Sequence, residues 1–173
     1  MTQEKVLYRA VIVFPLRRKK VLLAKKNEEE QKIGAGCRNG YGGGIEDGES
    51  ACDAAVRELA EESGLVAEPE HFEKVAEIAF HNQREKDGTF FICQCDVFTV
   101  RVWRGKVRPT RTMLDPRWYF TQRLPLDEMM LADRTWVPLV LNGWKIIGEA
   151  WYGPRQKALL KQTRIRFVSG FNS

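Results

Sequence analysis

The 173-residue chain is long enough to bury a hydrophobic core in one domain without help from disulfides or a structural metal. Hydrophobic residues make up 43% and charged residues 29% of the sequence, which is a globular composition, and no stretch approaches the roughly 20 apolar residues of a membrane span. The net charge of +5 suits a polyanionic substrate. Because the basic residues fall in three separate segments, at 17–20, 101–111 and near the C-terminus, we expect solvated surfaces and no stable nucleic-acid partner.

Neither the N-terminus nor the cysteines indicate secretion. Residues 1–8 lack the basic start, apolar stretch and cleavage site of a secretory signal, which predicts a cytoplasmic protein. The four cysteines contain no Cys-x-x-Cys pair, so reduced thiols are favoured over zinc ligands. Cys93 and Cys95 lie two apart in an apolar run, and a strand would point both the same way.

Strands and a glycine-rich segment are expected first along the chain. Residues 6–14 are β-branched and apolar and predict a buried strand, with residues 21–24 as its hairpin partner. A polar loop follows at 27–37. Residues 39–44 contain too many glycines for a helix, which predicts backbone that approaches a ligand closely or takes positive φ.

The clearest helix in the sequence is expected from about residue 51 to residue 62. Ser50, with Glu49 before it, offers an N-cap, and Ser63 and Gly64 supply the C-terminal stop. An apolar stripe runs along one side of this helix, formed by Cys52, Ala55, Val56 and Leu59.

More strands and a second helix are expected after this helix. The predicted strands are 74–81, 89–100, 117–122, 144–152 and 157–168, of which the last two form a closing hairpin. Between them, Asp133 can cap a helix in which Trp136 and Val140 recur at helical spacing. The order and lengths of these elements predict an α/β sandwich with a mixed β-sheet.

Three glutamates on the first helix carry the chemistry. Glu58, Glu61 and Glu62 stand at i, i+3 and i+4, so their carboxylates share one face. Each like-charge pair costs a few tenths of a kcal/mol, and a divalent cation is the natural compensation. Oxygen ligands favour Mg²⁺ or Mn²⁺ over zinc. A second interpretation is a solvated acidic face of the helix, and the spacing of the three glutamates alone does not decide between it and a metal site.

The wider pattern decides between these two interpretations. It reads Gly43, five residues, Glu49, seven residues, Arg57-Glu58-Leu59, one residue, Glu61-Glu62, one residue, Gly64-Leu65. Seven fixed identities at this spacing arise by chance about once in 10⁸ start positions. The pattern matches the Nudix box at every position, and the chain is identified by it as a member of the Nudix hydrolase family.

The resemblance implies a fold, a cofactor and a set of roles. It implies a single Nudix hydrolase domain over 1–173, a monomeric α/β/α sandwich that acts on a nucleotide. The implied magnesium ligands are the Gly43 carbonyl, Glu58, Glu61 and Glu62. Glu49 or one of the helix glutamates would orient the attacking water, and Arg57 would orient a neighbouring glutamate.

Residues outside the box resemble the MutT-type 8-oxo-dGTP diphosphatases within this family. The similarity includes residues 34–36, 39–43 and 136–139 and extends to the final hairpin. It implies that Asn39 and Asp133 read the base edge, that Lys26 contacts phosphate and that Phe80 lies in the base pocket. The residues alone leave other roles open: a turn for Asn39, an exposed strand end for Lys26 and the core for Phe80.

Several positions depart from the MutT-type pattern. Ala132 stands where that group has a second aspartate, so Asp133 alone should be ionised and should only accept hydrogen bonds. Met130 replaces a stacking tryptophan, and Arg9 replaces a small polar residue of the pocket. A loop carboxylate that can complete the metal site is missing unless Asp115 substitutes for it.

The leading hypothesis is an enzyme that cleaves a nucleoside triphosphate, in oxidised or ordinary form, to the monophosphate and pyrophosphate. A second hypothesis is a Nudix hydrolase for ADP-ribose, a nucleotide sugar, a dinucleoside polyphosphate or a capped RNA, since the altered pocket permits it. A third is a non-catalytic module that binds nucleotides or RNA. The complete set of carboxylates argues against the third, because a pure binder gains nothing from clustered like charges.

Overall fold

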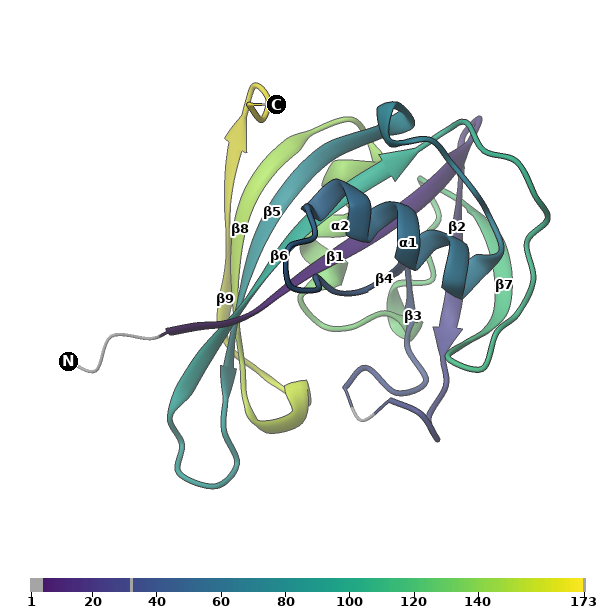
Figure 1. Ribbon diagram of the computed structural model, residues 1–173. Coiled ribbons are helices and arrows are strands. Elements are labelled where there is room, and N and C mark those ends of the chain that lie inside the picture. The colour runs from purple at the N-terminus through teal and green to yellow at the C-terminus, as the bar shows by residue number, and fades with distance from the viewer. Residues whose placement is uncertain (1–4, 32, 173) are drawn as a thin grey trace.

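A strongly twisted mixed sheet forms the centre of the molecule in the computed structural model, which describes residues 5–31 and 33–172 (Figure 1). Its strands are β1 (Lys5–Arg17), β2 (Lys20–Lys26), β3 (Arg38–Asn39), β4 (Tyr41–Gly44), β5 (Phe72–Gln83), β6 (Phe90–Val100), β7 (Met113–Phe120), β8 (Lys145–Tyr152) and β9 (Leu159–Val168). Most of them follow the order β3-β2-β1-β6-β5-β8-β9, while β4 pairs with β1 and β7 pairs with β2. β1 pairs with β6, and β5 with β8, in parallel, and the other pairs are antiparallel. The predicted α/β sandwich with a mixed sheet is confirmed.

Two helices cover opposite faces of the sheet. In Figure 1, α1 (Ala51–Ser63) lies in front of β1 and β6, and α2 (Asp133–Leu141) lies behind them. Short 3₁₀ turns, η1 (Pro69–His71), η2 (Leu126–Glu128) and η3 (Pro154–Gln156), connect the strands and helices. No helix in the described part of the chain is long and apolar enough to cross a membrane.

The alternation of side chains along β1 divides the core into two clusters. Phe14 and Leu16 point toward α2 and pack with Trp136, whereas Val11 and Val13 belong to the cluster on the α1 side. Successive side chains of a strand face opposite sides, so one buried strand supplies both layers. This explains why the apolar residues run on without alternation from Ala10 to Phe14.

The caps of α1 are those expected from the sequence. The Ser50 hydroxyl accepts a hydrogen bond from the Asp53 amide, and Gly64 adopts a left-handed conformation with φ of 80° at the C-terminus. Ala55 and Leu59 are fully buried against the sheet. The helix is therefore fixed at both ends and along its apolar face, which gives its glutamates a rigid support.

Two local predictions are wrong. Asp133 does not cap α2, because it is itself the first helical residue and its Oδ1 accepts a hydrogen bond from the Trp136 indole. The strand expected at 117–122 is β7, which begins at Met113 and ends at Phe120. Its bounds follow from antiparallel pairing with β2, a contact between distant segments that the local sequence does not contain.

Candidate functional site

Two carboxylates of α1, those of Glu58 and Glu62, face the glycine-rich strand β4. A Cβ atom on Gly42 would overlap the carbonyl of Val11, and one on Gly43 would lie 2.5 Å from Oε1 of Glu58. Neither glycine has positive φ, so of the two reasons expected for the glycines of this segment, close approach applies here. Bare backbone at Gly43 lets the Glu58 carboxylate lie directly against the strand.

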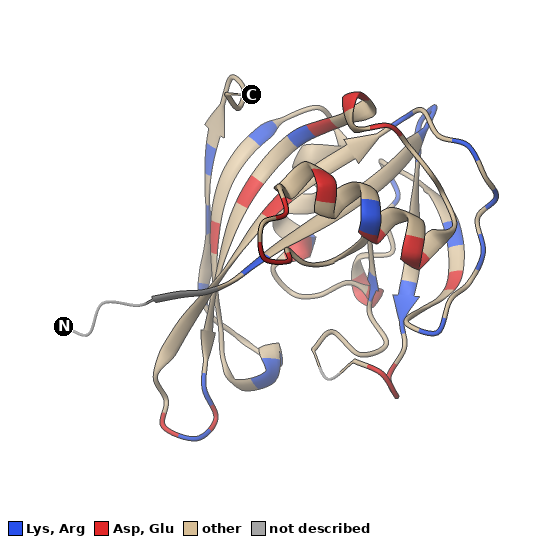
Figure 2. Ribbon diagram, in the orientation of Figure 1, with Lys and Arg blue, Asp and Glu red and all other residues tan. Residues whose placement is uncertain are grey.

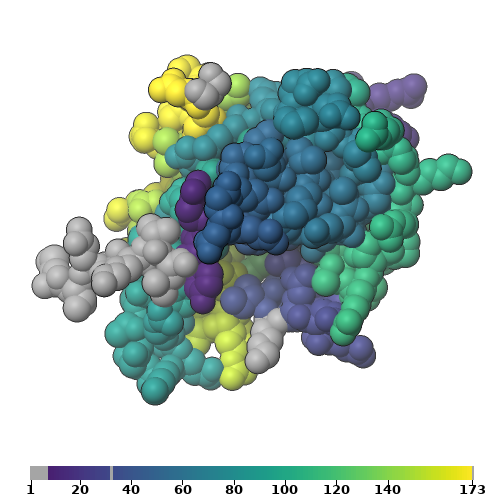
Figure 3. All heavy atoms as spheres, in the orientation of Figure 1, coloured from purple at the N-terminus to yellow at the C-terminus, as the bar shows by residue number. Residues whose placement is uncertain are grey.

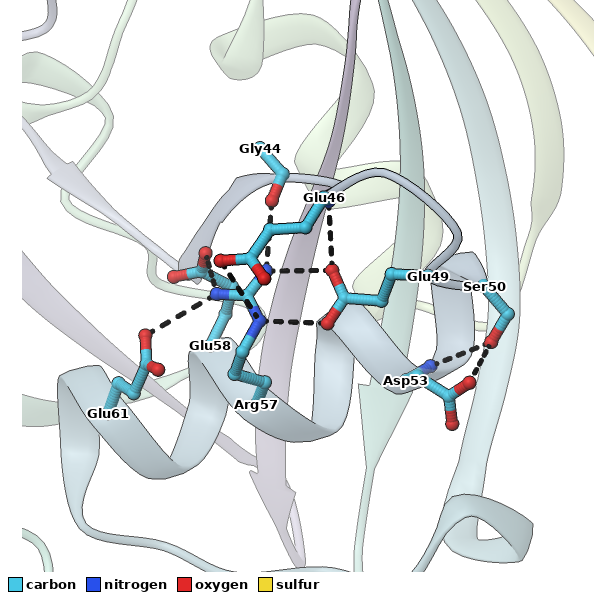
Figure 4. Close-up of polar contacts among 8 residues, drawn as sticks. All are labelled: Gly44, Glu46, Glu49, Ser50, Asp53, Arg57, Glu58 and Glu61. Atoms are coloured by element: carbon cyan, nitrogen blue, oxygen red, sulfur yellow. Dashed lines mark hydrogen bonds and ion pairs between the residues drawn. The ribbon is translucent and has the colours of Figure 1, made fainter.

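Arg57 connects the carboxylates of the motif (Figure 4). Its Nε and Nη2 donate to the two oxygens of Glu49 at 2.8 and 2.9 Å, and its Nη1 donates to Glu58 at 2.7 Å and to Glu61 at 3.4 Å. Nη2 also donates to the carbonyl of Gly44 at 3.0 Å. These are the contacts expected of a residue that orients its neighbours.

The bidentate contact with Arg57 changes the chemistry of Glu49. Hydrogen bonds from Arg57, and then from the Glu46 amide, lower the pKa of Glu49 to about 2. A carboxylate with so low a pKa is a poor proton acceptor at neutral pH. Between the two expectations for the water-orienting group, the geometry therefore favours a helix glutamate over Glu49.

Glu62, like Glu58, is a buried carboxylate of the motif. Its Oε2 accepts a hydrogen bond from the Gly42 amide at 2.9 Å, and its Oε1 accepts one from the Thr112 hydroxyl at 3.2 Å. Burial raises its pKa to about 7. Burial also raises the pKa of Glu58, whereas the Glu61 side chain is 60% exposed.

In the described residues, no three His, Cys, Asp or Glu side chains converge as a ready-made metal site. The reason is visible in the contacts: Arg57 stands among Glu49, Glu58 and Glu61, while Glu62 turns toward β4. The donors nevertheless suit a hard divalent cation, since they are carboxylate oxygens whose burial penalises the anionic form. Metal ligation by Gly43 and the three helix glutamates stays a prediction.

A pocket of about 160 Å³ opens beside this carboxylate cluster, with Gly43 in its wall. It is smaller than the 300–1,000 Å³ typical of sites for whole drug-sized ligands, so it suits a single base. Five residues expected at the substrate line it: Lys26, Asn39, Phe80, Met130 and Asp133. Sequence reasoning missed other lining residues: Ile33, Cys93, Cys95 and Gln156 among them.

Asp133 lines this pocket and has a buried carboxylate oxygen without a hydrogen-bond donor. The residue is 2% exposed, and no group in the described ranges donates to its Oδ2, while Oδ1 accepts from the Trp136 indole at 3.0 Å. Burial raises its pKa to about 6, against the opposing effect of nearby Lys26. A buried acceptor without a donor costs free energy, so this oxygen favours a ligand that carries an N–H group.

The other predicted pocket residues occupy distinct positions. Asn39 is buried in β3 without positive φ, so it is not a turn residue, and its Oδ1 accepts from the Gly40 amide. Lys26 forms no side-chain ion pair or hydrogen bond with any other described residue, which leaves its ammonium available. Phe80 stacks on Tyr152 at 6.3 Å and packs against the core, so it serves both the core and the pocket wall.

Two predicted residues do not lie at the site. The Arg9 side chain is 59% exposed and approaches Asp96 at 3.9 Å, because it projects from the face of β1 opposite to that of Ile12. Asp115 is held by Arg38 and Arg117 and does not join the carboxylates of α1. The pocket role expected for Arg9 and the metal role considered for Asp115 do not fit these positions.

The residues missed by sequence reasoning had weak local signals. Gln156 follows the Gly153-Pro154 turn and has a φ of 55°, and its amide donates to Asn82 Oδ1 at 2.6 Å. Cys93 and Cys95 both face the pocket, as expected for residues two apart on a strand. Their spacing predicts that both side chains lie on the same face of the strand, but only the fold shows that this face borders the pocket.

Comparison with known proteins identifies the motif independently. A family model described as NUDIX domain matches residues 6–140. Oxidized purine nucleoside triphosphate hydrolases are similar over most of both chains: the protein from Danio rerio is 32% identical over 86% of each chain, and that from Mus musculus 34% over 82% of this chain and 83% of its own. A mutator MutT protein from Bacillus halodurans superposes with a TM-score of 0.74 at 22% identity, over 92% of this chain and 97% of its own, which shows the shared fold.

Proposed function

The chain belongs to the NUDIX domain family, and on that premise we propose that it is a Mg²⁺-dependent pyrophosphohydrolase for a purine nucleoside triphosphate, including oxidised forms. It would release the nucleoside monophosphate and pyrophosphate. The relatives from zebrafish and mouse, named for oxidised purine nucleoside triphosphates, support this substrate class. The proposal rests above all on Asp133, which lines a base-sized pocket and has a buried Oδ2 without a donor. Gly43 lies in the wall of the same pocket and against the Glu58 carboxylate.

The base would be read by Asp133 and Asn39. At neutral pH a carboxyl with a pKa of about 6 is ionised and accepts hydrogen bonds only, so Asp133 suits the adjacent N–H donors of a guanine-type edge. The amide of Asn39 can donate to a carbonyl oxygen of the same base. Met130 and Phe80 would supply apolar contacts to its faces.

The triphosphate would extend from this pocket toward α1. Lys26 lines the pocket and lowers the pKa of Glu62, so its charge lies between the base site and the carboxylates, where a phosphate would pass. Glu58, Glu61, Glu62 and the Gly43 carbonyl would hold the divalent cation. That cation would neutralise phosphate charge and make bound water more acidic.

The protein side chains would position the reacting groups. Arg57 holds Glu49, just before α1, and Glu58, in the second half of the helix, so an arriving phosphate would meet carboxylates that need no rearrangement. Among the glutamates, Glu62 is held by the Gly42 amide and the Thr112 hydroxyl, so its buried carboxylate has a fixed direction. We assign to it the water-orienting role.

A substrate panel tests the proposal. The protein is incubated with Mg²⁺ and 8-oxo-dGTP, dGTP, ADP-ribose or a dinucleoside polyphosphate, and the products are separated by chromatography. We expect the monophosphate and pyrophosphate from one or both guanine nucleotides, and loss of turnover in Glu62→Gln. The exposed Glu70→Gln, on η1, is the matched control and should retain full activity.

Other outcomes would redirect the assignment. Release of inorganic phosphate from a triphosphate would contradict the cleavage position. If ADP-ribose were the only compound hydrolysed, the substrate class would be nucleoside diphosphate derivatives instead of nucleoside triphosphates. Unchanged hydrolysis in Glu62→Gln would show that the proposed metal chemistry is wrong.

A further inference from the structure

Two basic segments that are distant in the sequence meet at the turn between β1 and β2. The Arg17 guanidinium lies 5.6 Å from the ring centre of Trp103 and 5.4 Å from that of Trp118. Arg101 and Arg123 line the same hollow as Lys19. Figure 2 shows blue segments at this turn and along the loop from β6 to β7, and in Figure 3 side chains of the turn protrude at the upper right. The fold therefore gathers charge that the sequence presents as scattered.

We call this area the basic turn surface, and its cations are Arg17, Arg18, Lys19, Lys20, Arg101 and Arg123. Within the described ranges, none of the six forms an ion pair or a side-chain hydrogen bond. Basic residues farther along the loop differ, because Arg104 pairs with Glu68 and Arg111 with Glu30. The concentration of unpaired positive charge around one turn produces a field that attracts polyanions.

Two adjacent hollows shape the basic turn surface. One of about 900 Å³ and one of about 660 Å³ share Arg18, Lys19 and Phe120 in their walls. The Phe120 ring is 53% exposed, and the Lys20 ammonium lies 4.6 Å from its centre. An exposed aromatic ring between unpaired cations is the combination by which proteins hold unpaired bases and their phosphates.

We propose that the basic turn surface binds single-stranded nucleic acid at a site separate from the nucleotide pocket. None of the residues that line the two hollows also lines the pocket that contains Asp133. A single strand fits better than a duplex, because only unpaired bases offer their faces to Phe120. It also fits better than an anionic membrane, because the aromatic ring here forms the wall of concave hollows instead of projecting from an amphipathic helix.

Binding of labelled oligonucleotides tests this proposal. Fluorescence anisotropy is measured on the full chain with chelator present, using fluorescein-labelled dodecamers of uridine or thymidine, so that hydrolysis plays no part. We expect binding that weakens with salt, with a slope of about 0.7 in log–log form for each phosphate contacted. The double substitution Lys19→Glu with Arg123→Glu should weaken binding at least tenfold, and Phe120→Ala at least fivefold.

A charge-matched variant separates this surface from general electrostatics. Lys86→Glu with Arg166→Glu, exposed on the β5–β6 hairpin and β9, makes the same charge change elsewhere and should alter affinity less than threefold. Nucleotide hydrolysis should be unchanged in all three variants, which also shows that they fold. Equal weakening by both charge reversals would overturn the proposal, as would displacement of the oligonucleotide by substrate nucleotide. Equally tight binding of a duplex, or retention on phosphatidylserine vesicles without oligonucleotide binding, would overturn it too.

Discussion

Replacing Asp133 with asparagine should change how the stability of the protein depends on pH. Burial raises the pKa of this carboxyl from 3.8 to about 6, because its charged form loses water and gains only the Trp136 indole as a donor. The folded protein thus holds the proton more tightly than the unfolded chain. The associated stability is fully present below about pH 4 and is lost as pH rises through about 6.

The size of this effect follows from the shift. About 2 pKa units correspond to about 3 kcal/mol, since each unit is about 1.4 kcal/mol. The substituted asparagine cannot ionise, so Asp133→Asn lacks this loss of stability. Relative to wild type, its free energy of unfolding should increase by about 3 kcal/mol as pH rises from about 4 to 8. The comparison cancels all other titrating groups that the two proteins share.

Urea titrations at several pH values, followed by tryptophan fluorescence without metal or nucleotide, would measure this difference. The exposed Asp47→Asn provides the control and should follow wild type across the range. If the curves for Asp133→Asn and wild type stay parallel within about 0.5 kcal/mol, the carboxyl does not carry the desolvation penalty inferred from its burial. The interpretation of Asp133 as a poised acceptor would then be wrong.

Three further predictions concern α1 and the strand beside it. Gly43→Ala should lower kcat at least tenfold with a small change in melting temperature, because the new Cβ would lie 2.5 Å from Glu58 Oε1; steady-state kinetics and calorimetry check this. Arg57→Lys should lower kcat almost as much as Arg57→Ala, because an ammonium cannot hold Glu49 through two parallel bonds; equal kcat for Arg57→Lys and wild type would contradict it. Leu59→Ala should lower the free energy of unfolding by about 2–5 kcal/mol, measured by urea titration, since Leu59 is fully buried. A loss below about 1 kcal/mol would contradict the packing of Leu59 described here.

The features that the sequence predicted best are those set by residues close together in the chain. The caps and apolar face of α1 are local features, and the same helix carries the motif from Glu49 to Glu62, so both element and motif were accessible. The pairing order of the strands was not, because it is set by contacts between segments that lie far apart in the chain. The β7 boundaries were misplaced for that reason.

The pocket was predictable only where a family pattern named its residues. Asn39 and Asp133 come from different elements, and only the fold brings them together. Arg9 was misassigned because a residue's place in a pattern does not fix which face of a strand it occupies, and neighbouring positions on β1 face opposite ways. Gln156 was missed because its approach to the pocket depends on a left-handed backbone that favours glycine.

The parallel pairing of β1 with β6 has a consequence for the kinetics of folding. Val11 meets Asp96 across this pair, so 85 residues of chain must be closed into a loop before the centre of the sheet exists. Such distant contacts slow folding, because the entropy of closing a long loop is lost before the contact forms. Until the loop closes, the surface that buries Leu59 lacks Phe98 and Val100 of β6. The apolar support of the helix that carries the glutamates is therefore complete only when the two ends of this loop have met.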